Sequence, residues 1–161
     1  MRGRRILGVD PGSRSTGYGI VDIRGNQLSP VAWGVIRTDG KESFPDRLFE
    51  IHEKLADVIR VHRPTEAAVE KVFLAKNASS ALKLGQARGA AIVTCRALGV
   101  AVHEYSAKEI KLAATGNGAA PKDQVAAMVG RLLGLREEIP PDASDALAMA
   151  FCRAVSRTFA P

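Results

Sequence analysis

The chain has 161 residues, of which 46% are hydrophobic and 25% are charged, and this balance predicts one globular domain over residues 1–161. The same composition excludes collagen-like, coiled-coil and disordered classes. Twenty-three Lys and Arg residues against 17 Asp and Glu residues give a formal net charge of +6, so a polyanionic partner is the first hypothesis.

The sequence lacks the signals of a secreted or membrane protein. The two cysteines, Cys95 and Cys152, lie far apart without C-x-x-C spacing, so neither a zinc ribbon nor a disulfide framework is predicted. The longest apolar stretches, such as residues 89–95, are much shorter than the ~18 residues that span a bilayer. The apolar run after the basic N-terminus ends at Asp10, unlike a signal peptide. We therefore expect a cytoplasmic protein with no membrane partner.

The first part of the chain has the pattern of strands. Residues 6–9 form a short apolar run that ends in the turn signal Asp10-Pro11-Gly12. Residues 17–21 and 31–36 have the composition of two further strands. We expect these three strands to form a small antiparallel meander.

Helical periodicity begins after Ser43, which starts a Ser-x-x-Asp sequence similar to a capping box. Apolar residues recur at helical spacing over residues 48–59, and Pro64 ends the helix. The next apolar run, residues 67–72, lies between two predicted helices and therefore indicates a central parallel strand, although it contains Glu70.

A long helix is predicted from Asn77 to about residue 98. Ala81, Gly85 and Gly89 lie four residues apart and leave one face of this helix almost bare. Each interior glycine costs roughly 1 kcal/mol relative to alanine. We therefore expect another backbone to approach this face closely.

The rest of the chain predicts one more strand, residues 100–104, followed by helices. Ser106 starts a capping box for a short helix, and Pro121 begins a helix that Gly134 closes. The last helix is expected from residue 142 to about residue 155. This order of elements predicts an α/β fold with a mixed five-stranded sheet and helices on both faces.

Four acidic residues are candidates for a functional site: Asp10, Glu70, Asp142 and Asp145. Asp10 ends the first strand, Glu70 interrupts the central strand, and the other two lie three apart on one face of the last helix. Ordinary explanations exist, because Asp before Pro-Gly is common in turns and Asp in a first helical turn is commonly a cap. Glu70 is harder to explain, since an unpaired buried carboxylate is costly.

Strand ends and a helix N-terminus can bring these four acids into one crevice. Four carboxylates cannot all stay ionised together without cations, and oxygen-only ligands suit Mg²⁺ or Mn²⁺. Two such ions about 3.5–4 Å apart hydrolyse phosphodiesters by in-line attack of water. A basic protein around an acidic metal site therefore indicates a nuclease with two Mg²⁺ ions, for which Mn²⁺ could substitute.

Three segments of the chain together resemble the RuvC family of Holliday-junction resolvases. They are residues 6–19 (ILGVDPGSRSTGYG), residues 69–89 and residues 142–148 (DASDALA), and they follow the family's order along almost the whole chain. The resemblance implies an RNase H-like fold, a homodimer, and paired nicks in opposing strands of a four-way DNA junction. It also implies divalent-metal catalysis leaving 5′-phosphate and 3′-hydroxyl ends, and a partnership with the RuvA–RuvB branch-migration complex in recombination and repair.

The resemblance also implies roles for individual residues. The same four acids match the family's catalytic metal ligands, although some members carry His in place of Asp142. Lys111 and Lys122 match basic residues near the scissile strand, and Phe73 matches an aromatic that can stack on an unpaired base for ~1–3 kcal/mol. Without the resemblance, Phe73 would be explained as a core residue and the lysines as solvated surface. Further phosphate contacts are expected from Arg14, Lys76, Lys83 and Arg88.

Two other functions remain open at this point. One is a catalytically silent junction-binding protein, which would gain nothing from four acids facing phosphate groups. The other is an RNase H-like nuclease that acts on RNA or hybrid duplexes, and only the family resemblance argues against it.

Overall fold

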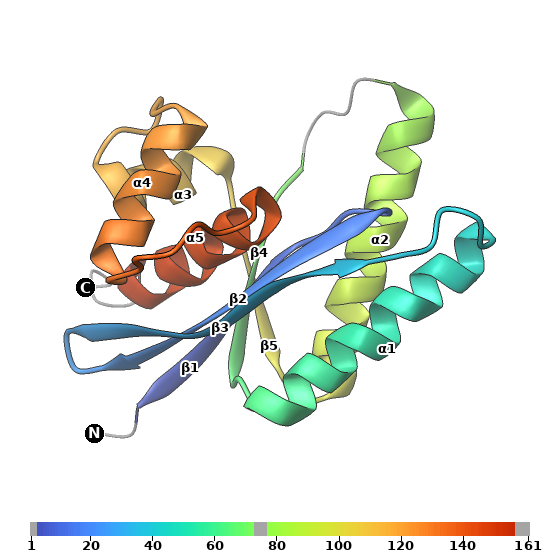
Figure 1. The fold of residues 1–161 in the computed structure, drawn as a ribbon, viewed down its shortest axis with the longest axis horizontal. Coiled ribbons are helices and arrows are strands. Elements are labelled where there is room, and N and C mark those ends of the chain that lie inside the picture. The colour runs from blue at the N-terminus through green and yellow to red at the C-terminus, as the bar shows by residue number, and fades with distance from the viewer. Residues whose placement is uncertain (1–2, 73–76, 157–161) are drawn as a thin grey trace.

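A mixed five-stranded sheet forms the centre of the structure, a computed structural model that describes residues 3–72 and 77–156 (Figure 1). The strands are β1 (Arg4–Asp10), β2 (Ser15–Arg24), β3 (Gln27–Arg37), β4 (Glu66–Glu70) and β5 (Ala101–Tyr105). Their order in the sheet is β3-β2-β1-β4-β5. β2 pairs antiparallel with β1 and β3, whereas β4 pairs parallel with β1 and β5. The predicted antiparallel meander and the central parallel strand are both confirmed.

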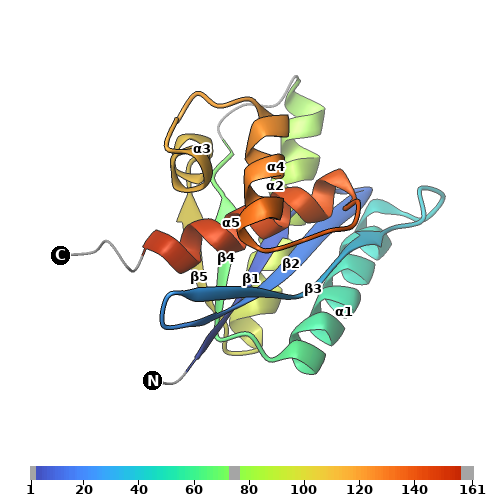
Figure 2. The ribbon, with the colours of Figure 1, turned by 60° about the vertical axis from the view of Figure 1, so that its left-hand side comes forward.

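Helices cover both faces of the sheet, as predicted. The described residues form α1 (Phe44–His62), α2 (Ala78–Ala97), α3 (Ala107–Thr115), α4 (Lys122–Leu132) and α5 (Pro141–Ser156). α1 and α2 lie on one face, and α5 lies on the other with α3 and α4 beside it (Figures 1 and 2). None of the described helices combines the length and hydropathy that crossing a membrane requires.

The sheet separates two apolar cores, because successive residues of a strand point to opposite faces. The core under α1 and α2 includes Leu7, Leu55 and Ala91. The core under α5 includes Ile6, Leu147 and Phe151. The neighbours Ile6 and Leu7 of β1 thus contribute to different cores, and both are fully buried.

The predicted helix starts are confirmed by their hydrogen bonds. At the start of α1, the Ser43 side chain accepts a hydrogen bond from the backbone N–H of Asp46. At the start of α2, the Asn77 side chain accepts one from the backbone N–H of Ser80. Ser106 and Glu109 form the reciprocal capping box that begins α3. These local contacts explain why the sequence pattern located the N-termini of these helices.

The bare face of α2 does not meet another backbone within the described part of the chain. A Cβ built at Gly85 or Gly89 would lie more than 4 Å from every atom of the other described elements. The apolar residues Leu82 and Val93 on the same helix are 67% and 65% exposed. The close approach expected at these glycines is therefore not made inside this chain, and the face is open.

Candidate active site

Three carboxylates meet where β1 ends and α5 begins. Asp10 is the last residue of β1, while Asp142 and Asp145 lie in the first two turns of α5. One carboxylate oxygen from each of the three lies within 4.8 Å of the others. All three residues are half-buried, so they share a partly desolvated environment that remains open to solvent.

Glu70 lies at the same end of the sheet, as the last residue of β4, which pairs with β1. It lines a cavity of about 240 Å³ together with Asp145, Lys111 and Lys122. Burial raises the pKa of Glu70, as does the charge of Asp145, while Lys122 and Lys111 lower it. Glu70 is therefore electrostatically coupled to the aspartates, although it stands outside their closest group.

Three glycines allow α5 to lie directly on the sheet. A Cβ at Gly17 would lie 2.0 Å from the backbone oxygen of Asp142, and side chains at Gly8 and Gly19 would also collide with α5. Any side chain at these positions would push the helix away from the strands. Because α5 carries Asp142 and Asp145, the glycines determine how close these acids come to the end of β1.

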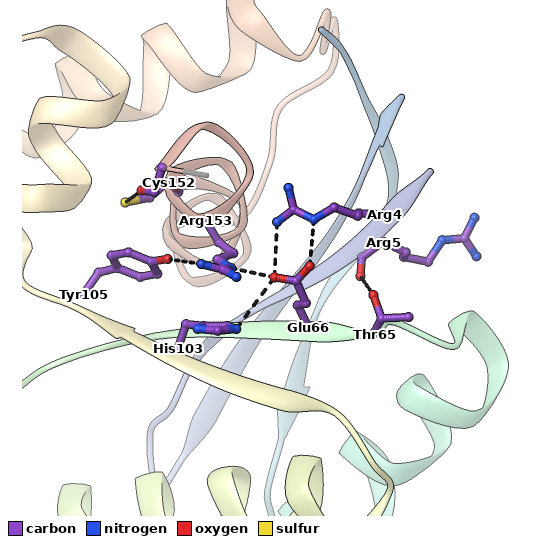
Figure 3. A network of polar contacts seen from close by, with 9 residues as sticks. Arg4, Arg5, Thr65, Glu66, His103, Tyr105, Cys152 and Arg153 are labelled. Carbon is purple, nitrogen blue, oxygen red and sulfur yellow. Dashed lines mark hydrogen bonds and ion pairs between the residues drawn. The ribbon is translucent and has the colours of Figure 1, made fainter. Parts of the chain in front are cut away.

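The other end of α5 is held by an ion cluster around Glu66 (Figure 3). Arg153 of α5 donates its Nε to Glu66 Oε2 at 2.6 Å, and Arg4 of β1 donates its Nε to Oε1 at 2.7 Å. Arg153 also donates to the Tyr105 hydroxyl, and His103 Nε2 lies 3.7 Å from Glu66 Oε2. The cluster links α5 to β1, β4 and β5, so the helix is fixed at the end opposite its acids.

Asp10 is affected by the charges of the other acids and of Lys122. Burial, followed by the charges of Asp145 and Asp142, raises the pKa of Asp10 to about 7, despite the opposing effect of Lys122. Clustered carboxylates of this kind become fully ionised when a cation neutralises them. A donor set made only of carboxylate oxygens fits a hard divalent cation such as Mg²⁺ or Mn²⁺.

Two lysines border the acids. Lys122 begins α4, and its Nζ lies 2.7 Å from Asp145 Oδ2. This hydrogen bond raises the pKa of Lys122, whose side chain is nevertheless 73% exposed. Lys111 comes from α3 and lines the same cavity. The structure thus places both predicted lysines beside the acids.

Arg88 braces the strand that carries Glu70. Its Nε donates to the backbone oxygen of Glu70 at 3.1 Å, and its Nη2 forms an ion pair with Glu104 of β5. The guanidinium therefore bridges the ends of β4 and β5 in this structure. Its expected phosphate contact stays a prediction.

The remaining predicted DNA contacts are dispersed. Arg14 is exposed in the loop between β1 and β2, and Lys83 is exposed on α2. Phe73 and Lys76 lie outside the described residues.

One contact was missed by the sequence reasoning. Ser15, at the start of β2, donates its Oγ to Asp142 Oδ2 at 2.7 Å. The available signal was the alternation of Ser15, Gly17 and Gly19, which places small residues on one face of a strand. Such a pattern indicates that another backbone approaches that face.

A sheet of this strand order, with acids at the ends of two neighbouring strands and in the helix lying across them, defines the RNase H-like class of nucleases. The family model described as crossover junction endodeoxyribonuclease RuvC matches residues 6–153. The chain belongs to this RuvC family. It is 55% identical over 151 residues to the RuvC of Citrifermentans bemidjiense, covering 94% of this chain and 92% of that relative.

Solved structures support the same assignment. The chain resembles Thermus thermophilus RuvC in complex with a Holliday junction substrate, with a TM-score of 0.90 and 34% identity over 96% of this chain and 94% of that one. The yeast mitochondrial Holliday junction resolvase shares the fold, with a TM-score of 0.68 and 15% identity over 92% of this chain and 77% of that one. The predicted family and the predicted RNase H-like fold are confirmed.

Proposed function

We propose that this chain resolves four-way DNA junctions by cutting two opposing strands through metal-dependent hydrolysis of phosphodiester bonds. The observation that carries the proposal is the meeting of Asp10, Asp142 and Asp145 within 4.8 Å, in a chain of a crossover junction endodeoxyribonuclease family. A solved relative at TM-score 0.90 contains a Holliday junction substrate. An acid cluster in a chain of net charge +6 fits a nuclease better than a silent binder.

We propose Asp10, Glu70, Asp142 and Asp145 as the residues that would hold two Mg²⁺ or Mn²⁺ ions. When bound, such ions activate a water molecule and stabilise negative charge on the scissile phosphate. The four carboxylates would hold the ions in place, and the half-buried position of Asp10 and Glu70 limits the access of solvent to the site. Burial and neighbouring carboxylates raise the pKa of both carboxyl groups, so an added positive charge would favour their ionised forms.

The chain supplies two further positive groups. We propose that Lys111 and Lys122 stabilise the charge that develops on the scissile phosphate during hydrolysis. Both line the cavity that also contains Glu70 and Asp145. The side chain of Lys122 is 73% exposed, so it is accessible to a phosphate group.

Contacts with the DNA outside the reacting phosphate are also proposed from the resemblance. Arg14 and Lys83 are exposed and available for phosphate groups. Phe73 follows Glu70 by three residues in the sequence, and we propose that it stacks on an unpaired base at the junction, with Lys76 contacting a nearby phosphate. Arg88 contributes by bracing Glu70, and it would contact phosphate only through the donors that Glu70 and Glu104 leave unused.

We propose that the open face of α2 forms a homodimer interface. Leu82, Gly85, Gly89 and Val93 follow one another at helical spacing, and the glycines leave room for the backbone of a partner helix. A twofold axis would match two symmetric cuts in opposing strands. Sedimentation should show a dimer at micromolar concentration that Gly89→Leu weakens. A monomeric wild-type chain with unimpaired cleavage would contradict the interface.

We also propose that residues 1–161 act as one nuclease domain in the cytoplasm, as their length, composition and cysteine usage indicate. The family resemblance adds the proposal of a partnership with the RuvA–RuvB complex.

The function is tested by offering a four-way junction, a linear duplex and an RNA–DNA hybrid to the chain with Mg²⁺. We expect cleavage of the junction by the wild type and none by Asp10→Asn, Glu70→Gln or Asp145→Asn, with junction binding retained or tighter because each removes a repulsive charge. Asp142→Asn should have the mildest effect. The exposed Asp57 of α1 provides the control Asp57→Asn, which should cut normally. Preferred cleavage of the hybrid would support the RNase H alternative, and binding without cleavage by the wild type would support a silent binder.

A further inference from the structure

The loop between β1 and β2 is held in place by residues outside the acid cluster. Thr38 donates its Oγ to the backbone oxygen of Ser13 at 2.8 Å. Arg47 of α1 donates its Nη2 to the same oxygen at 2.7 Å. These two bonds fix the backbone immediately before Ser15, where β2 begins.

Ser15 makes a defined contact from this fixed position. Its Oγ lies 2.7 Å from Asp142 Oδ2. Gly17, two residues further along β2, points to the same side of the sheet, and a Cβ there would lie 2.0 Å from the backbone oxygen of Asp142. β2 carries none of the four acids, yet it contacts Asp142 through both the backbone and the carboxylate.

The other carboxylate of α5 has a different partner. Asp145 is paired with the ammonium of Lys122, a positive group that a bound cation would replace. Asp142 is instead bound by the neutral hydroxyl of Ser15, which can remain in place when a cation binds because it occupies a single oxygen. The two acids of the helix are therefore organised in different ways.

We propose that Ser15 is a positioning residue that orients Asp142 as a metal ligand. The side-chain torsion that turns an Asp carboxylate has broad, shallow preferences. A hydrogen bond on Oδ2 restricts this rotation and leaves the second oxygen for a cation shared with Asp10 and Asp145. Partners of this kind change metal affinity or activity by roughly 10- to 100-fold when they are removed. The inference rests on the proposed metal site.

Other roles for Ser15 make different predictions. A hydroxyl that only stabilises the fold would lower the thermal unfolding midpoint when removed, without a specific effect on metal binding. A hydroxyl that contacts DNA would change junction affinity while leaving metal binding intact. Metal binding in the absence of DNA therefore separates the positioning role from both.

The test is a titration of the DNA-free protein with Mn²⁺, with bound ion measured by electron paramagnetic resonance. We expect Ser15→Ala to weaken Mn²⁺ binding at least about tenfold with an unchanged unfolding midpoint. Ser15→Thr retains the hydroxyl and should restore most of the affinity. The control Ser29→Ala removes a hydroxyl from an exposed position on β3 and should have no effect.

A double-substitution cycle tests whether Ser15 acts through Asp142. In the Asp142→Asn background, Ser15→Ala should cause little further loss of Mn²⁺ affinity, since the effects of coupled residues are not additive. Loss of Mn²⁺ binding in Asp10→Asn tests the metal site itself, so failure of the site is distinguished from failure of the Ser15 role. Wild-type Mn²⁺ affinity in Ser15→Ala, or equal losses in both backgrounds, overturns the proposal.

If Ser15→Ala does not fold, Ser15→Cys provides the same test with a side chain of similar size and a weaker donor. Mn²⁺ affinity below that of Ser15→Thr supports the positioning role. Affinity equal to wild type in the cysteine variant contradicts it.

Discussion

The Nζ of Lys122 lies 2.7 Å from Oδ2 of Asp145, which places the first residue of α4 directly on the acid cluster. The hydrogen bond raises the pKa of Lys122, with smaller contributions from the charges of Asp10 and Asp142. The ammonium therefore supplies positive charge to the site before any metal binds. A cation that takes over Asp145 would release this exposed side chain toward a bound phosphate.

This relationship predicts that both lysines act in the cleavage step. Lys111→Ala and Lys122→Ala should slow single-turnover cleavage of bound junction at least tenfold, about 1.4 kcal/mol or more on the barrier. Lys54→Ala is the matched control, because Lys54 is also exposed and paired with a carboxylate, that of Glu50. Normal rates on bound DNA with only weaker, salt-dependent binding would place the lysines among general phosphate contacts.

The raised pKa of Asp10 predicts an unusual pH dependence of stability. Its pKa is about 7 in the folded chain against a usual value of 3.8. Between about pH 4 and 7 the folded state therefore binds a proton that the unfolded state has released, so the free energy of unfolding falls as pH rises through this window. Above pH 7 this contribution is constant.

Asp10→Asn should therefore be more stable than the wild type at pH 8 without metal, by on the order of 2 to 4 kcal/mol. The two chains should become equally stable near pH 4, where the wild-type carboxyl is protonated. Urea unfolding in a chelating buffer across this range measures the difference. Added Mg²⁺ should stabilise the wild type at pH 8 and not the variant. A stability difference between wild type and Asp10→Asn that stays constant from pH 4 to 8 contradicts the prediction.

The features of the fold that could be predicted from the sequence are those set by residues close to one another along the chain. Ser43 and Ser106 cap helices through backbone groups three positions away, and Asp10 ends a continuous apolar run. The antiparallel meander was predicted, but its second and third strands extend further than residues 17–21 and 31–36, because polar residues flanking the turn at Gly25 conceal the strand ends. The structure shows Gly25 at φ +60 between Arg24 and Gln27, which are paired across it.

In the candidate site, the sequence could not predict contacts between residues that lie far apart along the chain. Asp10 and Glu70 stand out because carboxylates are unexpected at buried strand ends, and Asp142 and Asp145 stand out by their spacing on one face of the last helix. The bond from Ser15 to Asp142 joins residues 127 positions apart, and that from Arg153 to Glu66 joins residues 87 apart. No local pattern encodes such pairs, since they depend on how α5 lies across the sheet. The expectation at Gly85 failed within the chain for the same reason, because spacing shows a bare face without showing what meets it.

The contact between Gly17 and α5 predicts that even a methyl group disturbs the site. Gly17→Ala would place a Cβ 2.0 Å from the backbone oxygen of Asp142, so the helix must move. We expect about 1–3 kcal/mol of destabilisation together with weaker metal binding and slower cleavage. Gly40→Ala is the control, because a Cβ there meets no atom within 4 Å. Full activity in Gly17→Ala would show that the acids tolerate a displaced helix.

The Glu66 cluster predicts a stability effect far from the acids. Burial alone would raise the pKa of Glu66, but hydrogen bonds from Arg4 and Arg153 and their charges lower it to about 2. A lowered pKa stabilises the fold above the unfolded value of about 4.5, and this stability is lost as pH falls toward 2. Its contribution at neutral pH is on the order of 3 kcal/mol.

Glu66→Gln should lose about this much stability at pH 7, because it leaves two arginines without their carboxylate. The difference from the wild type should shrink below pH 4, as chemical unfolding at several pH values would show. Exposed Glu53 of α1 offers the control Glu53→Gln, which should change stability by less than about 0.5 kcal/mol. A pH-independent loss in Glu66→Gln would indicate that packing, rather than charge, explains the cluster.

Because the sheet divides the interior into two cores, amino-acid substitutions in one core should not depend on substitutions in the other. The cores under α1 and α2 and under α5 share none of their buried residues. Substitutions in separate environments add their free energies when they have no common partners. A change at Leu55 and a change at Phe151 should therefore be independent of each other. The helix α2, with its open face, and the helix α5, which carries two of the acids, can thus vary separately, each limited by its own side of the sheet.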